Sequence, residues 1–271
     1  MAELADAYGS GPYGATRGGS SPLVSIDPFS ESVRRMESAF TQKEPSSIQS
    51  LFGRIAHRYD FANTVLSLGC DSLWRLKVGA MVRSWHPAAI LDLATGSGVL
   101  AQELKRQSPS ARVVGADFCA PMLNVARRRG VAELVVADGL ALPFRDALFD
   151  VVTVAFGLRN MASHEIALSE ARRVLRGGGH IVILDFSLPS PPLRALYRLY
   201  LHHFLPVLAG LLTGEPDAYR YFAGSIETFP KGAEMLELLR RCGFSNCEAN
   251  PLTMGIVTVY TAERQTANGE R

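Results

Sequence analysis

Residues 90–101 read ILDLATGSGVLA, a short apolar run followed by a turn with two glycines and then a second apolar segment. This pattern predicts a buried strand, a tight turn and the start of a helix. Gly96 and Gly98 would let a ligand approach the backbone closely, and the free amides at the start of the helix would point toward it. We therefore expect a ligand-binding loop at this turn.

The turn by itself is compatible with more than one ligand. Gly96, Gly98 and Ala101 also satisfy the dinucleotide-binding pattern G-x-G-x-x-A, and the same glycines can simply make a tight strand-to-helix connection. The residues that follow neighbouring strands are needed to separate these interpretations.

Four further runs rich in β-branched residues alternate with longer segments of helical period: ARVVGAD, AELVVAD, FDVVTVAF and GHIVILDF. Continuous apolar runs of this kind are typical of parallel strands that are covered by helices on both faces. After Asp185 the alternation is interrupted, and it resumes near Phe244 with a predicted closing antiparallel pair. The sequence therefore predicts one doubly wound, mostly parallel α/β domain, with the interruption over the binding edge of its sheet.

Acidic residues stand at the ends of three predicted strands. Asp92, just before the turn, could bind an ammonium group and would repel a pyrophosphate. Asp117 lies about 20 residues beyond the glycines, the position from which a carboxylate accepts ribose hydroxyls. Asp138, followed by Gly139, suits the amino group of an adenine. Each acid alone is often a helix cap, but their joint spacing favours S-adenosylmethionine.

Composition limits the ligand class further. The chain has 271 residues, a formal net charge of +2, 47% hydrophobic residues and 20% charged residues. The apolar composition excludes wholesale disorder, and the small net charge gives no reason to expect a nucleic-acid partner. The four cysteines have neither metal-ligand nor disulfide-scaffold spacing, so no metal site is expected and the thiols are expected to be reduced.

The segments LDLATGSG, GADFCAPML, ADGLALPF and FDVVTVAFGLRN resemble, in order and spacing, the motifs of class I methyltransferases. The last of these resembles the ubiquinone/menaquinone biosynthesis C-methyltransferase family in particular. Two longer signatures of that family have counterparts, one from Tyr59 to Trp74 and one from Arg173 to Ser187. The resemblance runs from about residue 47 to residue 264.

This resemblance implies a Rossmann-like class I methyltransferase fold with one antiparallel strand near the C-terminus and an N-terminal helical lid. We expect a flexible tail over 1–45, a methyltransferase domain over 46–264 with the lid at 46–87 and inserted substrate-side helices at 193–230, and a C-terminal tail over 265–271. The residues expected to contact S-adenosylmethionine are Asp92, Gly96, Ser97, Gly98, Asp117, Met122, Asp138, Gly139 and Ala155.

The implied reaction is methylation of a ring carbon of a polyprenyl quinol, demethylmenaquinol first among them. Loss of a phenolic proton makes such a carbon nucleophilic, so the protein must bind, orient and deprotonate the ring. The resemblance gives catalytic roles to Arg159, expected to stabilise the phenolate, and to Tyr59. The predicted substrate contacts are Asp60, Asn63, Asn160, Tyr221 and Ser225.

Val99 departs from the family at a position that usually holds an aspartate of the proton-removing network. Another group could serve as base, with His203 the first candidate, or the substrate could arrive as phenolate, or this copy could have lost or changed its activity. Methylation of a soluble aromatic acceptor, a cofactor-binding protein without turnover and a nicotinamide oxidoreductase remain alternative hypotheses.

The segment 191–214 has an apolar, partly amphipathic character that suits a prenyl tail as well as a core-covering helix. Its stretch without charged residues, from Leu199 to Gly214, is too short for the roughly 20 residues of a membrane-spanning helix and contains Pro206. We expect a cytoplasmic protein that associates peripherally with the membrane surface, where its quinol substrate resides. The sequence leaves open whether the protein forms a homo-oligomer.

Overall fold

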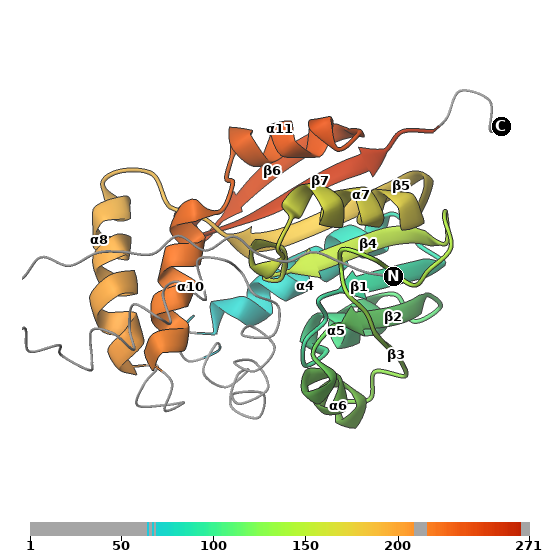
Figure 1. Cartoon of the computed structure of the whole chain (residues 1–271), viewed down its shortest axis with the longest axis horizontal. Helices are drawn as coiled ribbons and strands as arrows, with labels where there is room; N and C mark the ends of the chain where they lie inside the picture. The colour runs from blue at the N-terminus through green and yellow to red at the C-terminus, as the bar shows by residue number, and fades with distance from the viewer. Residues whose placement is uncertain (1–63, 65–66, 68, 209–215, 267–271) are drawn as a thin grey trace, which may run out of the picture. The chain divides into compact units, whose positions relative to one another are not determined.

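The computed structural model describes residues 64, 67, 69–208 and 216–266, with the backbone alone at 216–221 (Figure 1). The predicted tail at 1–45 and half of the predicted lid at 46–87 lie outside this range. Within the described end of this segment the chain forms the helix α4 (Cys70–Ser84).

A single seven-stranded sheet has the order β3-β2-β1-β4-β5-β7-β6. The strand β7 runs antiparallel to both of its neighbours, β5 and β6, and all other pairs of adjacent strands are parallel. This confirms the predicted doubly wound sheet with one antiparallel strand. The strands are β1 (Ala89–Leu93), β2 (Arg112–Asp117), β3 (Glu133–Val136), β4 (Phe149–Ala155), β5 (Leu175–Phe186), β6 (Phe244–Leu252) and β7 (Val257–Arg264).

Helices cover both faces of the sheet. One face packs against α7 (His164–Val174) and α11 (Ala233–Arg241), and the other packs against α4, α5 (Val99–Gln107) and α6 (Ala120–Arg128). Each helix contributes an apolar stripe, as the helical periods of the sequence predict. The sheet therefore has two separate cores, one on each side.

The strand β1 shows how the sequence pattern becomes this arrangement. All five of its residues are buried; Leu91 and Leu93 belong to the core beneath α7, whereas Ile90 belongs to the core beneath α4 and α5. Because successive side chains of a strand alternate between faces, Asp92 points to the same side as Ile90. The carboxylate is thus directed toward α4 and α5.

Between β5 and α11 the chain forms α8 (Leu193–Leu199), a π-helical turn η2 (Tyr200–Phe204) and α10 (Pro216–Thr228), all within residues 193–230. Figure 1 shows α8 and α10 next to each other, and Arg198 Nε lies 3.0 Å from Glu227 Oε1 between them. Tyr197, Leu201 and Ile226 form a small buried core there. Across the described residues, no helix combines the length and apolarity that a bilayer crossing requires.

Candidate functional site

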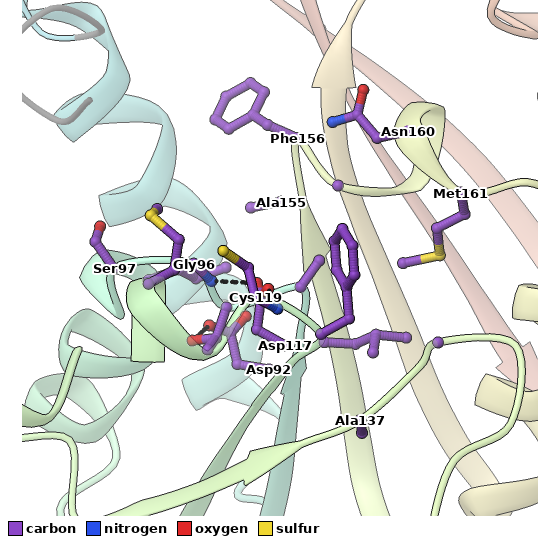
Figure 2. A pocket seen from close by; sticks show the side chains of 18 of the residues that line it. Asp92, Gly96, Ser97, Asp117, Cys119, Ala137, Ala155, Phe156, Asn160 and Met161 are labelled. Carbon is purple, nitrogen blue, oxygen red and sulfur yellow. Dashed lines mark hydrogen bonds between the residues drawn. The ribbon is translucent and has the colours of Figure 1, made fainter. Parts of the chain in front are cut away.

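A pocket lies where the carboxyl ends of β1, β2 and β4 meet the loops that follow them (Figure 2). The strand order reverses between β1 and β4, and open α/β sheets bind ligands at such a switch point. In Figure 2, Asp92 and Asp117 lie beside Gly96 and Cys119, Phe156 lies above Ala155, and Asn160 and Met161 lie on the far side of the drawn pocket. Its wall therefore combines a carboxylate-rich part with an apolar part.

The two glycines of the turn have different roles. Gly96 lines the pocket, and its backbone φ is +55°. Gly98 has a φ of +79°, and a Cβ there would lie 2.7 Å from Val131 Cγ2 and 2.9 Å from Ala126 Cβ. Gly98 does not line the pocket. A glycine is required at position 98 because α5 starts in close contact with the end of α6. The structure thus gives Gly98 a packing role, whereas we predicted a contact with the cofactor.

Asp117 connects the glycine turn to the loop after β2. Its Oδ2 accepts a hydrogen bond from Gly96 N at 2.8 Å, and its Oδ1 accepts one from Cys119 N at 2.8 Å. Burial raises the pKa of this carboxyl, while the backbone donors act in the opposite direction. Each carboxylate oxygen can accept a further hydrogen bond, so the arrangement suits a diol.

Asp92 is more deeply buried, with 1% of its surface exposed. Its two oxygens accept hydrogen bonds from Thr95 Oγ1 at 2.6 Å and from Thr153 Oγ1 at 2.7 Å. Desolvation nevertheless raises its pKa to about 6. A carboxyl held in this way is stabilised in its charged form by a cation brought next to it.

Asp138 and Gly139 line the pocket just after β3. Asp138 is exposed, and its Oδ1 accepts a hydrogen bond from Leu140 N at 2.9 Å. A Cβ on Gly139 would lie 3.1 Å from Met161 Sδ, so the glycine keeps a narrow slot open between backbone and thioether. An acceptor beside an apolar slot suits a flat heterocycle that carries an amino group.

The loops after β1 and β4 approach each other unusually closely, and both are strained. Ala94 and Phe156 have φ values of +54° and +58°, which are unfavourable for residues with a Cβ, and for a bulky residue above all. A Cβ on Gly157 would lie 2.4 Å from Ala94 Cβ. The Phe156 ring is held by Phe186, with centroids 4.7 Å apart, and by Trp74, with centroids 6.1 Å apart.

Arg159 does not lie where we predicted. It is 3% exposed and does not line the pocket, since its Nη1 donates to Asp185 Oδ1 at 2.7 Å and to the Phe156 carbonyl at 2.8 Å. The Phe222 and Phe186 rings cover its guanidinium, with centroids 4.9 and 5.5 Å from Cζ. The ion pair and these rings turn the side chain away from the cofactor side. Arg159 Nε and Asp185 Oδ2 are buried and have no hydrogen-bond partner among the residues that the structure describes.

The other predicted residues divide into three groups. Ser97, Met122, Ala155 and Asn160 line the pocket together with Asp92, Gly96, Asp117, Asp138 and Gly139. His203 is exposed and Ser225 donates its hydroxyl to the Phe222 carbonyl at 2.7 Å, and neither residue lines the pocket. Tyr59, Asp60, Asn63 and the side chain of Tyr221 lie outside the described residues.

Sequence reasoning missed several lining residues. Thr95 precedes the predicted Gly96, and Phe118 and Cys119 follow the predicted Asp117, so their neighbours in sequence could have pointed to them. Arg75 and Phe156 also line the pocket. Arg75 stands on α4, the helix before β1, and no local pattern indicates it. Within the described part of the chain, no group of His, Cys, Asp or Glu side chains could hold a metal ion.

These residues fit S-adenosylmethionine. Asp138 and the slot at Gly139 suit the adenine, Asp117 suits the ribose diol, and the acidic part around Asp92 suits the positively charged methionine end. The sheet order and this pocket define a class I S-adenosylmethionine-dependent methyltransferase. A solved structure agrees on the fold: a methyltransferase of Thermotoga maritima, described as a possible histamine N-methyltransferase, has a TM-score of 0.58 at 19% identity and covers 80% of this chain and 99% of its own.

Residues 39–264 match the ubiE/COQ5 methyltransferase family, and the chain belongs to that family. The demethylmenaquinone methyltransferase of Thermus thermophilus is 45% identical over 222 residues, which cover 79% of this chain and 100% of that protein. The demethylmenaquinone methyltransferase of Deinococcus radiodurans is 39% identical over 230 residues, 83% of this chain and 95% of that protein. The family resemblance of the sequence motifs is thereby confirmed.

Proposed function

We propose that this chain transfers the methyl group of S-adenosylmethionine to a ring carbon of a polyprenyl quinol, with demethylmenaquinol as its substrate. The observation that carries the proposal is the identity of 45% and 39% to two demethylmenaquinone methyltransferases over nearly their whole length. The bound cofactor supplies an electrophilic methyl group on a sulfonium. The chain supplies orientation and a place for the phenolic proton.

The apolar part of the pocket supports an aromatic acceptor. Ala155, Phe156 and Met161 line it, and Phe156 continues into an aromatic cluster with Phe186 and Phe222, whose rings are 4.9 Å apart. Asn160 offers amide groups on the same wall and could hold a quinol hydroxyl. A flat ring with polar edges matches these surroundings.

Arg159 contacts residues of the pocket wall without lining the pocket itself. Its Nη1 binds the Phe156 carbonyl and so holds this strained residue, and it directly precedes Asn160 in η1 (Leu158–Asn160). We therefore give Arg159, paired with Asp185, a positioning role for Phe156 and Asn160. Contact with the phenolate, as its motif suggested, would require Phe222 and Phe186 to move away from the guanidinium.

The proton acceptor is a separate question, because Val99 lines the pocket at the first position of α5 and cannot accept a proton. Nothing in the described geometry brings His203 to the pocket. The ring must therefore lose its proton to another group or enter already ionised.

Peripheral association with the membrane is supported by an apolar surface on the helical insertion. Leu196 is 64% exposed, Phe204 56% and Val207 64%, and Leu199 and Leu208 are exposed as well. Burial of apolar area in a lipid surface yields about 25 cal/mol per Å², and a quinol with a prenyl tail would be reached there. Leu196→Glu together with Phe204→Glu should reduce cosedimentation with phospholipid vesicles.

The direct test is methyl transfer by the purified protein to demethylmenaquinol in detergent micelles, compared with a short-tailed naphthoquinol. We expect a ring-methylated product, with kcat/KM at least about tenfold higher for the long tail, because tail burial adds binding free energy. Equal rates for both acceptors would favour a soluble aromatic substrate. Cofactor binding without transfer to any quinol would instead indicate a protein that has lost catalysis.

A further inference from the structure

Arg75 differs in charge from every other residue of the pocket wall. Among the described lining residues there are three carboxylates, those of Asp92, Asp117 and Asp138, and Arg75 is the only lysine or arginine. Its side chain is 11% exposed, so the guanidinium is largely withdrawn from bulk water. A single cation in an otherwise acidic pocket suggests that the ligand carries one negative group.

The position of Arg75 along the pocket is defined by its neighbours. Its Cζ lies 5.8 Å from the centroid of the Phe156 ring, and its charge acts on Asp92, whose pKa it lowers against the larger effect of burial. Arg75 therefore lies near the Asp92 part of the pocket. The slot at Gly139, which suits the adenine, lies beside Met161, and Figure 2 shows Met161 on the far side of the pocket from Asp92.

The side chain is also held in a fixed orientation. Arg75 Nη1 forms an ion pair with Asp71, one helical turn earlier on α4. Asp71 in turn accepts hydrogen bonds from Thr64 Oγ1 at 3.3 Å and Ser67 Oγ at 3.1 Å. A guanidinium carries five N–H donors, so the pair with Asp71 leaves donors for a second carboxylate.

We propose that Arg75 binds the α-carboxylate of the methionine part of S-adenosylmethionine. This inference rests on the cofactor of the proposed function. The ammonium, sulfonium, ribose and adenine of that molecule all suit carboxylates or acceptors, which the pocket supplies, but its carboxylate needs a cation. Arg75 is the described lining residue that can meet this requirement, and it stands at the end of the pocket where the methionine belongs.

The test compares two ligands by titration calorimetry. Decarboxylated S-adenosylmethionine keeps the adenosine, the sulfonium and the amine and lacks only the carboxylate. We expect the wild type to bind S-adenosylmethionine roughly 10- to 100-fold more tightly than the decarboxylated ligand, the range of a hydrogen-bonded charge pair. In Arg75→Met this preference should vanish or reverse, with affinity for the decarboxylated ligand retained. That retained affinity also reports that the pocket has folded.

Arg75→Lys should keep part of the preference, since it keeps the charge without the planar fork. Arg83→Met is the matched control, because Arg83 is exposed near the end of the same helix, and it should leave the preference unchanged. Unchanged preference in Arg75→Met, or a wild type that binds both ligands equally, would overturn the inference alone. A wild type that binds neither ligand would overturn the proposed function.

Discussion

Arg159 Nη1 lies 2.7 Å from Asp185 Oδ1, and the two side chains are 3% and 0% exposed. Their pairing joins η1, just after β4, to the end of β5. A buried ion pair adds little net stability compared with an apolar pair of similar size, but the loss of one partner leaves an uncompensated charge in the interior. The pair therefore makes the shape of the site depend on both residues.

Asp185→Asn should lower the free energy of unfolding by about 3–5 kcal/mol, because Arg159 would be left buried without its counter-charge. The double variant Arg159→Met, Asp185→Leu should recover most of this loss, since it removes both charges. Urea unfolding measures all three proteins. Arg240→Met, in an exposed pair with Glu237, is the control and should change the value by less than about 1 kcal/mol. A double variant no more stable than the single one contradicts this account.

Val99→Asp should raise the rate of quinol methylation roughly tenfold or more, because it places a proton acceptor on the pocket wall. The first turn of α5 contains no other acid, and a carboxylate at a helix N-terminus is favourable by about 0.3–1 kcal/mol. Val99→Asn is the control, of similar shape but without basicity. Equal rates for the two variants would mean that the proton leaves the ring by a route that does not involve position 99.

The stability of the protein should depend on pH through Asp92. Its pKa is raised from 3.8 to about 6 by burial, so the folded protein binds a proton more tightly than the unfolded chain. The associated stability is present below the unfolded pKa and is lost as the pH rises through about 6. Relative to the wild type, Asp92→Asn should therefore gain about 3 kcal/mol between about pH 4 and pH 7, at about 1.36 kcal/mol per pKa unit. A pH-independent difference would show that Asp92 keeps its ordinary pKa.

The same carboxyl should couple cofactor binding to proton release. The sulfonium and ammonium of the cofactor favour the charged form of Asp92, so affinity should rise with pH up to about 6 and level off above it. Calorimetry in buffers of different ionisation enthalpy at about pH 5.5 should detect a released proton. The Asp92→Asn variant should release markedly less, and equal release by both proteins would assign the proton to another group.

Gly157→Ala should destabilise the protein by about 1–3 kcal/mol, because the new Cβ would lie 2.4 Å from Ala94 Cβ. Adding Ala94→Gly should restore stability, since it removes the clashing atom and a residue with a φ of +54°. Gly224→Ala is the control: that glycine lies in α10, and no atom of the described residues outside the helix backbone lies within 4 Å of the new Cβ, so a small gain in stability is expected. A neutral Gly157→Ala would mean that the two loops separate easily.

The parts of the site that the sequence predicted are those with a local origin. Asp92, Asp117 and Asp138 lie at or just beyond the carboxyl ends of β1, β2 and β3, and parallel strands bring these ends to one edge of the sheet. Strand period, turn glycine and strand order therefore suffice to place these three acids in one pocket. The role of Gly98 could not be obtained in this way, because the atoms that exclude a side chain there belong to Ala126 and Val131.

The amino-acid sequence by itself determined the doubly wound sheet, the glycine turn and the acidic strand ends, because apolar periodicity and turn chemistry are properties of short segments. Only the tertiary structure decided that Arg75 joins the pocket and that Arg159 lies outside it. Arg75 reaches the pocket through the packing of α4 on the sheet, whereas Arg159 is withdrawn by Asp185 of β5 and Phe222 of α10. These contacts join residues far apart in the chain, and no local pattern encodes them.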